Sequence, residues 1–99
     1  MRDEIIAILL KVCNELNEQL KNKIEIEKGE KAPLFGKQGV LDSLGLVNLI
    51  VSAESEVEEK FGKSLMLTDG ASLPEANSPF RTIGSLAYYI TDLLEDEKQ

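Results

Sequence analysis

Ser43 is the residue of this sequence whose surroundings best suit covalent chemistry, and it lies between Asp42 and Leu44. The upstream glycines, Gly36 and Gly39, predict a loop, and the proline-free residues that follow Ser43 predict a helix. A serine hydroxyl at a helix start is accessible and lies beside free backbone N–H groups, which would stabilise an attached phosphate. Ser43 is therefore a candidate modification site, although Asp42-Ser43 alone also fits an ordinary helix start.

The chain lacks the residues that would make Ser43 a catalytic nucleophile by itself. It has no histidine, which excludes a Ser-His-Asp triad, and one cysteine without imidazole does not build a usual zinc site. Asp69-Gly70 lacks the spaced oxygen ligands of a calcium loop, and Gly36 and Gly39 belong to no nucleotide-binding fingerprint. We therefore expect no metal site and no enzyme activity, and Ser43 fits a substrate that another protein activates.

Composition predicts one domain over residues 1–99. With 42% hydrophobic and 29% charged residues the chain can bury one modest core, and its single cysteine excludes an internal disulfide framework. A formal net charge of −7 argues against nucleic acid and favours basic partners, although an acidic surface can also serve solubility alone. Near the N-terminus we find no signal peptide or membrane span, so we expect a soluble, cytoplasmic monomer with no membrane contact.

Apolar periodicity predicts a first helix from Arg2 to Leu20 and then a long connection over residues 21–42. The helix stripe, in which Cys13 is expected to be a core residue rather than a reactive thiol, consists of Ile5, Ile6, Leu9, Val12, Cys13, Leu16 and Leu20. No helical period survives in the connection, which should be pinned across the bundle by its apolar residues Ile24, Ile26, Leu34, Phe35, Val40 and Leu41.

A second helix is expected from Asp42 or Ser43 to about Phe61, with Gly62 in the left-handed position that follows a helix. Its core face collects Leu46, Leu49, Ile50, Ala53, Val57 and Phe61. The other face carries Leu44, Val47, Asn48 and Val51, and then acids that include Glu54 and Glu58. We expect a small exposed apolar patch beside Ser43; the alternative is a helix start buried on both sides.

Residues 62–81 are expected to be mainly loop, with one short helical turn near Ser72 to Ala76. Thr82 can cap a last helix, whose core stripe is Ile83, Leu86, Ala87, Ile90 and Leu94. Residues 95–99 should form a frayed acidic tail. Three longer helices, one short helix and few strand signals predict an all-α four-helix bundle.

The run Gly39-Val40-Leu41-Asp42-Ser43-Leu44, with Val47, Leu49-Ile50 and the later Glu58-Glu59-Lys60-Phe61-Gly62, resembles the acyl carrier protein family. The resemblance covers nearly the whole chain. It implies an acyl-carrier bundle in which Ser43, flanked by Asp42 and Leu44, receives 4′-phosphopantetheine from coenzyme A through a phosphopantetheinyl transferase. The thiol of that arm would hold acyl groups as thioesters for acyl-transferring and condensing enzymes of fatty-acid, lipid or polyketide-type biosynthesis.

The resemblance also implies a docking surface on the second helix for basic partner enzymes, formed here by Leu44, Val47, Asn48, Val51, Glu54 and Glu58. Three departures from the family pattern suggest a specialised carrier. Asn48 stands where many carriers have an acid, and Phe61 falls about one helical turn later than the family pattern places it. The loop over residues 65–81 is longer than in a minimal carrier. An aminoacyl or peptidyl carrier, and an acidic helical interaction module without a cofactor, remain alternatives. A hydrolase using Ser43 would need an internal base that is absent.

Overall fold

The computed structural model describes residues 2–36, 39–67 and 78–96, and these residues are mostly helical. Three α-helices are present, α1 (Arg2–Asn17), α2 (Ser43–Phe61) and α3 (Ile83–Asp96), with one 3₁₀-helix, η1 (Ile26–Lys31). Within the described ranges extended pairing is limited to two isolated bridges, Pro33 with Thr82 and Phe35 with Leu41. The all-α class predicted from the sequence is confirmed.

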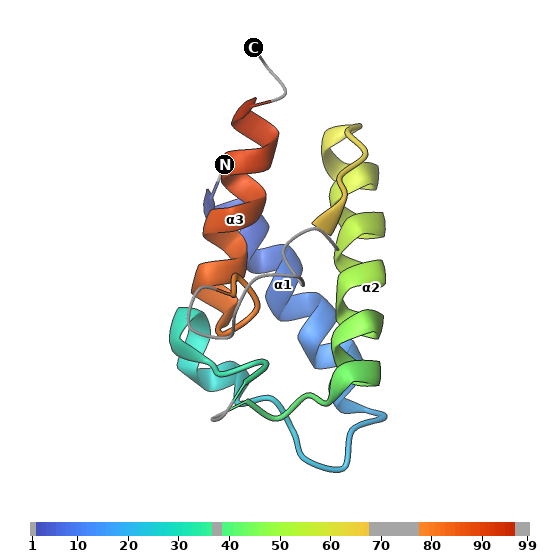
Figure 1. The fold of residues 1–99 in the computed structure, drawn as a ribbon, viewed down its shortest axis with the longest axis vertical. Helices are drawn as coiled ribbons and strands as arrows, with labels where there is room; N and C mark the ends of the chain where they lie inside the picture. The colour runs from blue at the N-terminus through green and yellow to red at the C-terminus, as the bar shows by residue number, and fades with distance from the viewer. Residues whose placement is uncertain (1, 37–38, 68–77, 97–99) are drawn as a thin grey trace.

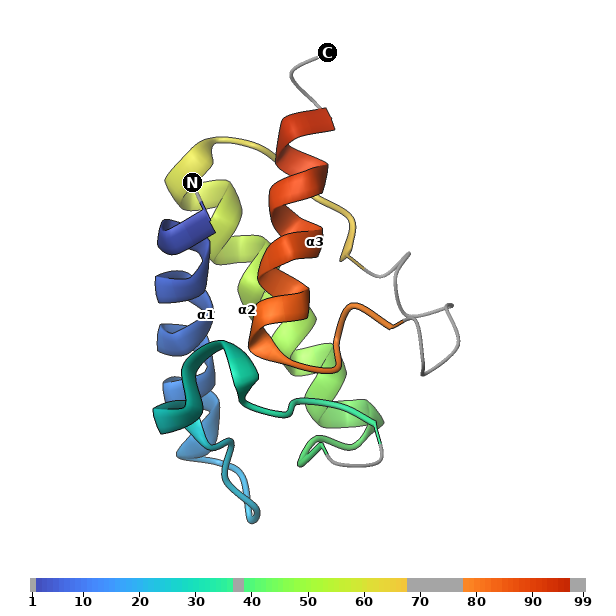
Figure 2. The ribbon, with the colours of Figure 1, turned by 90° about the vertical axis from the view of Figure 1, so that its left-hand side faces the viewer.

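The three α-helices form a triangular bundle in which α1 packs against both α2 and α3. Figure 1 shows α1 behind the other two helices, and the turned view in Figure 2 shows α2 behind α1 and α3. Their inward faces share one apolar cluster whose fully buried members include Leu9, Leu49, Phe80 and Leu86. A rigid core therefore lies directly under the inner face of α2.

Helix α1 is shorter than predicted and is rotated relative to the expected stripe. It ends at Asn17, whose side-chain oxygen accepts the Ile24 N–H at 2.8 Å and whose side-chain nitrogen donates to the Ile24 carbonyl at 3.0 Å. These two bonds close the turn that follows the helix, so Leu20 lies in that turn and not in α1. The buried residues are Ile5, Ile8, Leu9, Val12 and Cys13, whereas Ile6, Leu16 and Leu20 are only partly buried.

The connection after α1 contains η1, which the sequence did not predict. Apart from Ile26 and Gly29 its residues are charged, and a helix of six residues has no apolar period to detect. Bonds to its surroundings hold it in place: Arg2 is ion-paired with Glu30, and the Ile83 N–H donates to the Ala32 carbonyl at 3.2 Å. The predicted apolar anchors are confirmed, since Ile24, Leu34 and Leu41 are buried and Ile26, Phe35 and Val40 are partly buried.

Helix α2 begins and ends where the sequence predicted. Asp42 is the N-cap, and Gly62 follows the last turn at φ 69° and ψ 21°, with its N–H donating to the Glu58 carbonyl at 2.8 Å. The core face is also confirmed, because Leu46, Leu49, Ile50, Ala53 and Val57 are buried and Phe61 is partly buried.

Replacing Gly62 by alanine should destabilise the protein by about 1 kcal/mol, because a side chain disfavours the left-handed backbone. No atom lies within 4 Å of an added Cβ at this position, so conformation alone sets the cost. Urea unfolding measures the change, and Gly62→Asn should lose less because asparagine tolerates this conformation. Equal stability of Gly62→Ala and the wild type would contradict the prediction.

Helix α3 is capped by a reciprocal pair, as the sequence predicted for Thr82. The Ser85 N–H donates to Thr82 Oγ1 at 3.1 Å, and the Thr82 N–H donates to Ser85 Oγ at 3.1 Å. The helix extends to Asp96, two residues into the expected frayed tail, because Leu94 in its last turns is fully buried. The short turn predicted near Ser72 to Ala76 lies outside the described residues. None of the helices described is both long and apolar enough to cross a membrane.

Candidate functional site

The site begins at the junction between the first connection and α2. Asp42 has extended backbone angles (φ −89°, ψ −174°), and its Oδ1 accepts the Gly45 N–H at 2.7 Å. Its carbonyl accepts the Leu46 N–H at 2.9 Å, so Ser43 is the first residue of α2. The exposure predicted for the Ser43 hydroxyl lies outside what the structure describes.

Backbone hydrogen bonds hold the loop that leads into Ser43. The Leu41 N–H donates to the Leu34 carbonyl at 2.9 Å, and the Leu34 N–H donates to the Arg81 carbonyl at 2.8 Å. The Phe35 N–H donates to the Phe80 carbonyl at 3.0 Å, so the same loop is bonded twice to the segment before α3. Leu34 is also fully buried, so the backbone at Leu34, Phe35 and Leu41 is held in place.

Close approach of the backbone requires glycine at Gly39. A Cβ there would lie 2.5 Å from the Leu34 carbonyl oxygen and equally near two backbone atoms of Phe35. Gly45, in the first turn of α2, is less crowded, with an added Cβ 3.1 Å from Leu41 Cδ2 and 3.3 Å from Asp42 Oδ1. The glycine of the sequence motif therefore serves a tight loop rather than a ligand cradle.

The outer face of α2 exposes the apolar residues predicted beside Ser43. Relative exposure is 70% for Leu44, 53% for Val47 and 59% for Val51, and Asn48 is exposed between them. Their spacing places them on one side of the helix over its first two turns. We call Leu44, Val47 and Val51 the outer apolar face. The alternative of a helix start buried on both sides is wrong for these residues.

The acidic end of this surface is only partly available to a partner. Glu58 is exposed, as the sequence predicted. Glu54 is half-buried, and its Oε2 accepts the Leu67 N–H at 2.7 Å. Its carboxylate thus fixes the segment that follows α2, a role that the acidic run in the sequence did not reveal.

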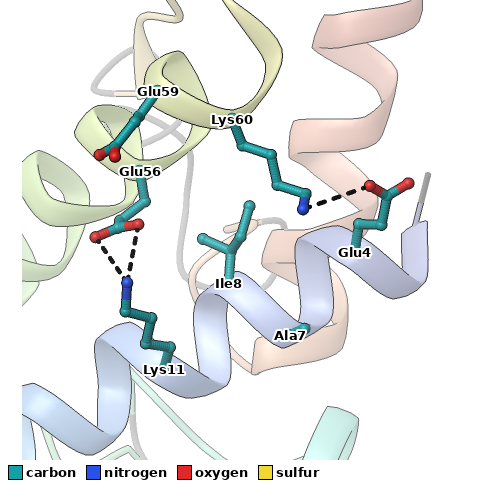
Figure 3. Close-up of a pocket in the computed structure, with 7 residues that line it drawn as sticks. All are labelled: Glu4, Ala7, Ile8, Lys11, Glu56, Glu59 and Lys60. Carbon is teal, nitrogen blue, oxygen red and sulfur yellow. Dashed lines mark hydrogen bonds and ion pairs between the residues drawn. The ribbon is translucent and has the colours of Figure 1, made fainter.

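A groove between α1 and α2 lies further along α2, away from Ser43. Its volume is about 490 Å³, and Figure 3 shows Ile8 between two ion pairs, Lys11 with Glu56 at 3.4 Å and Lys60 with Glu4 at 3.7 Å. Exposed pairs of this kind contribute roughly 0–1 kcal/mol. Each lysine of the groove pairs with a carboxylate of the facing helix, so the two ion pairs bridge α1 and α2. The groove therefore offers no unpaired cation to a ligand.

Metal binding has no candidate in the described ranges, where no group of three or more His, Cys, Asp or Glu side chains is placed to hold an ion. Comparisons with protein-family models, curated proteins and solved structures found no match. The chemical features near Ser43 are a capped helix start, the backbone bonds at Leu34, Phe35 and Leu41, and the outer apolar face.

A smaller pocket adjoins Ser43 between the end of α1 and the start of α2. It has a volume of about 320 Å³ and is lined in part by Asp42 and Leu44, the two neighbours of Ser43 in sequence. The opposite wall comes from the end of α1 and the residues just after it, including Lys21. The sequence did not indicate this wall, because its residues precede Ser43 by more than twenty positions.

Cys13 is a buried core residue, as predicted, and burial raises its thiol pKa to about 12 from 9.0. The raised pKa lowers the thiolate fraction about a thousandfold at neutral pH, so native Cys13 should resist thiol reagents at pH 8. It should react after unfolding in guanidinium. Between pH 9 and 12 the unfolded state releases a proton that the native state retains, so this group makes stability fall as pH rises. Rapid labelling of native Cys13 would contradict the prediction.

Proposed function

We propose that this chain is an acyl carrier protein whose Ser43 receives 4′-phosphopantetheine from coenzyme A through a separate transferase. The arm's thiol would carry acyl intermediates as thioesters between enzymes of fatty-acid, lipid or polyketide-type biosynthesis. One observation carries the proposal: Ser43 opens α2 directly after its N-cap, and the outer apolar face begins at the next residue. The resemblance of the surrounding sequence to acyl carrier proteins is the reason to interpret Ser43 as the acceptor of phosphopantetheine.

The helix start suits a phosphorylated serine. Attachment to Ser43 leaves a phosphodiester with one negative charge, which the dipole of α2 and the N–H groups of its first turn favour. The side chain of Asp42 already accepts the Gly45 N–H, so the phosphate would use other donors of that turn. The Ser43 proton must leave with help from the transferase, since the chain has no histidine.

The outer apolar face supports docking of partner enzymes. Leu44, Val47 and Val51 offer apolar contact, and Glu58 adds a negative charge near one end. A partner with an apolar strip bordered by basic residues would complement it, and the neutral Asn48 removes one charge contact that many carriers offer. We expect the protein to act as a cytoplasmic monomer that meets one partner at a time.

The proposal is tested by incubating the protein with coenzyme A and each of several phosphopantetheinyl transferases, followed by intact-mass measurement. We expect a gain of one phosphopantetheine per chain. If no transferase modifies the wild type, the carrier assignment fails. The mass of thioesters recovered from cells would separate an acyl carrier from an aminoacyl or peptidyl carrier.

A non-carrier interaction module is the second candidate, and the outer apolar face favours it because that face does not depend on the chemistry of Ser43. Such a module would stay unmodified with every transferase. It would still bind its partner through Val47 and Val51, and replacing either residue by serine would weaken that binding. Modification at Ser43 in cells would exclude this candidate.

A further inference from the structure

Met66 is an exposed apolar side chain in the segment that follows α2. Burial alternates along this segment, because Leu65 and Leu67 are buried whereas Met66 between them is 68% exposed. Figure 1 shows the segment, in gold, turning at the end of α2 and running back beside that helix. The two leucines thus anchor the segment in the core and leave Met66 on the surface.

The Glu54 carboxylate determines where Met66 lies. Its Oε2 accepts the Leu67 N–H at 2.7 Å, and that nitrogen is bonded directly to the carbonyl carbon of Met66. Glu54 lies about one turn beyond Val51 on the same side of α2. The backbone of Met66 is therefore held at the Val51 end of the outer apolar face, so the fold extends that face to a residue outside α2.

We propose that Met66 belongs to the surface on which the transferase docks, and that Glu54 supports docking by holding Met66 rather than by pairing with a basic residue. The inference rests on the proposed function, since the partner is the enzyme that modifies Ser43. Ser43 opens α2, so this enzyme approaches where the outer apolar face begins. An apolar strip of the enzyme that follows this face from Leu44 reaches Met66 after about 15 Å.

Charge favours a basic enzyme over a second copy of this chain as the occupant of this surface. Each copy carries a formal net charge of −7, so two copies would repel one another. Glu58 is exposed about one turn beyond Glu54, where a lysine or arginine of the enzyme can pair with it. Methionine suits such a surface, because its flexible thioether side chain adapts to the shape of an apolar partner.

The test compares two substitutions of Glu54 in the modification assay. Glu54→Gln removes the charge but keeps a side-chain oxygen that can accept the Leu67 N–H, whereas Glu54→Ala removes both. We expect Glu54→Ala to raise the apparent KM of the transferase about threefold to tenfold with kcat unchanged, and Glu54→Gln to stay within about twofold of the wild type. Hydrogen exchange at the Leu67 amide should be faster in Glu54→Ala than in Glu54→Gln.

Substitutions of Met66 test the contact itself. Met66→Ser should raise the KM as much as Glu54→Ala does, and the double variant should be no worse than either, because both changes remove the same contact. Met66→Leu should keep the wild-type KM, since leucine supplies similar apolar surface. Tyr88→Ser is the matched control and should leave the KM unchanged. Tyr88 is 63% exposed, but it lies on the side of α3 where Gly84 meets Glu30.

The outcomes separate this inference from the carrier function. If the wild type gains the arm and Met66→Ser keeps its KM, the carrier function stands and Met66 has no part in docking. If Glu54→Gln loses as much as Glu54→Ala, the Glu54 charge contacts the enzyme directly and its proposed role is overturned. A wild type that gains no mass overturns the carrier function, and the docking surface for the transferase falls with it.

Discussion

Ser43→Ala should abolish phosphopantetheine transfer completely while leaving the fold and its stability nearly unchanged. The hydroxyl is the acceptor atom, and alanine offers no oxygen in its place. The helix start does not depend on it, because Asp42 supplies the N-cap with its side chain on the Gly45 N–H. We therefore expect no mass gain with any transferase, and a free energy of unfolding within about 0.5 kcal/mol of the wild type.

Ser55→Ala is the matched control for this variant. Ser55 is exposed on the same helix, and the same substitution there should leave modification at the wild-type rate. Intact mass after a fixed incubation measures both variants, and urea unfolding confirms that both are folded. A Ser43→Ala protein that gains the arm as readily as the wild type would show that another residue is the acceptor.

The parts of the fold that the sequence predicted well are those set by local chemistry. Asp42, Gly62 and Thr82 each mark a helix boundary through their own backbone or side-chain bonds, so their residue types were enough. The buried and exposed faces of α2 were also predictable from the sequence. One apolar stripe runs the whole length of the helix, as a core face does, whereas the second covers only its first two turns.

The features that the sequence missed depend on contacts between distant segments. The helix η1 is held by Arg2 and by the backbone at Ile83, neither of which its own residues reveal. Helix α1 is apolar over a broad band and touches two neighbours, so spacing alone did not show that Ile8 would be buried and Leu16 only partly so. In the sequence Glu54 looks like any solvent-facing acid, because only the fold brings the Leu67 N–H to its carboxylate.

The site is built on a helix that is fixed along one side and open along the other. Leu49 and Ile50 anchor the inner side of α2 in the core, and a backbone bond to Leu34 holds Leu41, just before the helix. The outer apolar face is therefore presented by rigid backbone rather than by a loop, which lowers the entropy lost when a partner docks.

Because one side of α2 is buried and the other is exposed, the same leucine-to-alanine change should affect stability on the buried side and docking on the exposed side. Leu49→Ala removes a side chain that is 0% exposed and should destabilise the protein by about 2–5 kcal/mol through lost burial and a cavity. Leu44→Ala removes one that is 70% exposed and should change stability by no more than about 0.5 kcal/mol. Urea unfolding of the two variants measures the difference.

Docking should respond in the opposite order. Leu44→Ala should raise the apparent KM of the transferase that modifies the wild type about fivefold to tenfold, because an exposed leucine next to the acceptor serine is a natural contact for the enzyme. Leu49→Ala, assayed at a temperature where it remains folded, should keep a KM near that of the wild type. If Leu44→Ala leaves the KM unchanged, the enzyme approaches Ser43 without the outer apolar face, and docking must be sought on another side of α2.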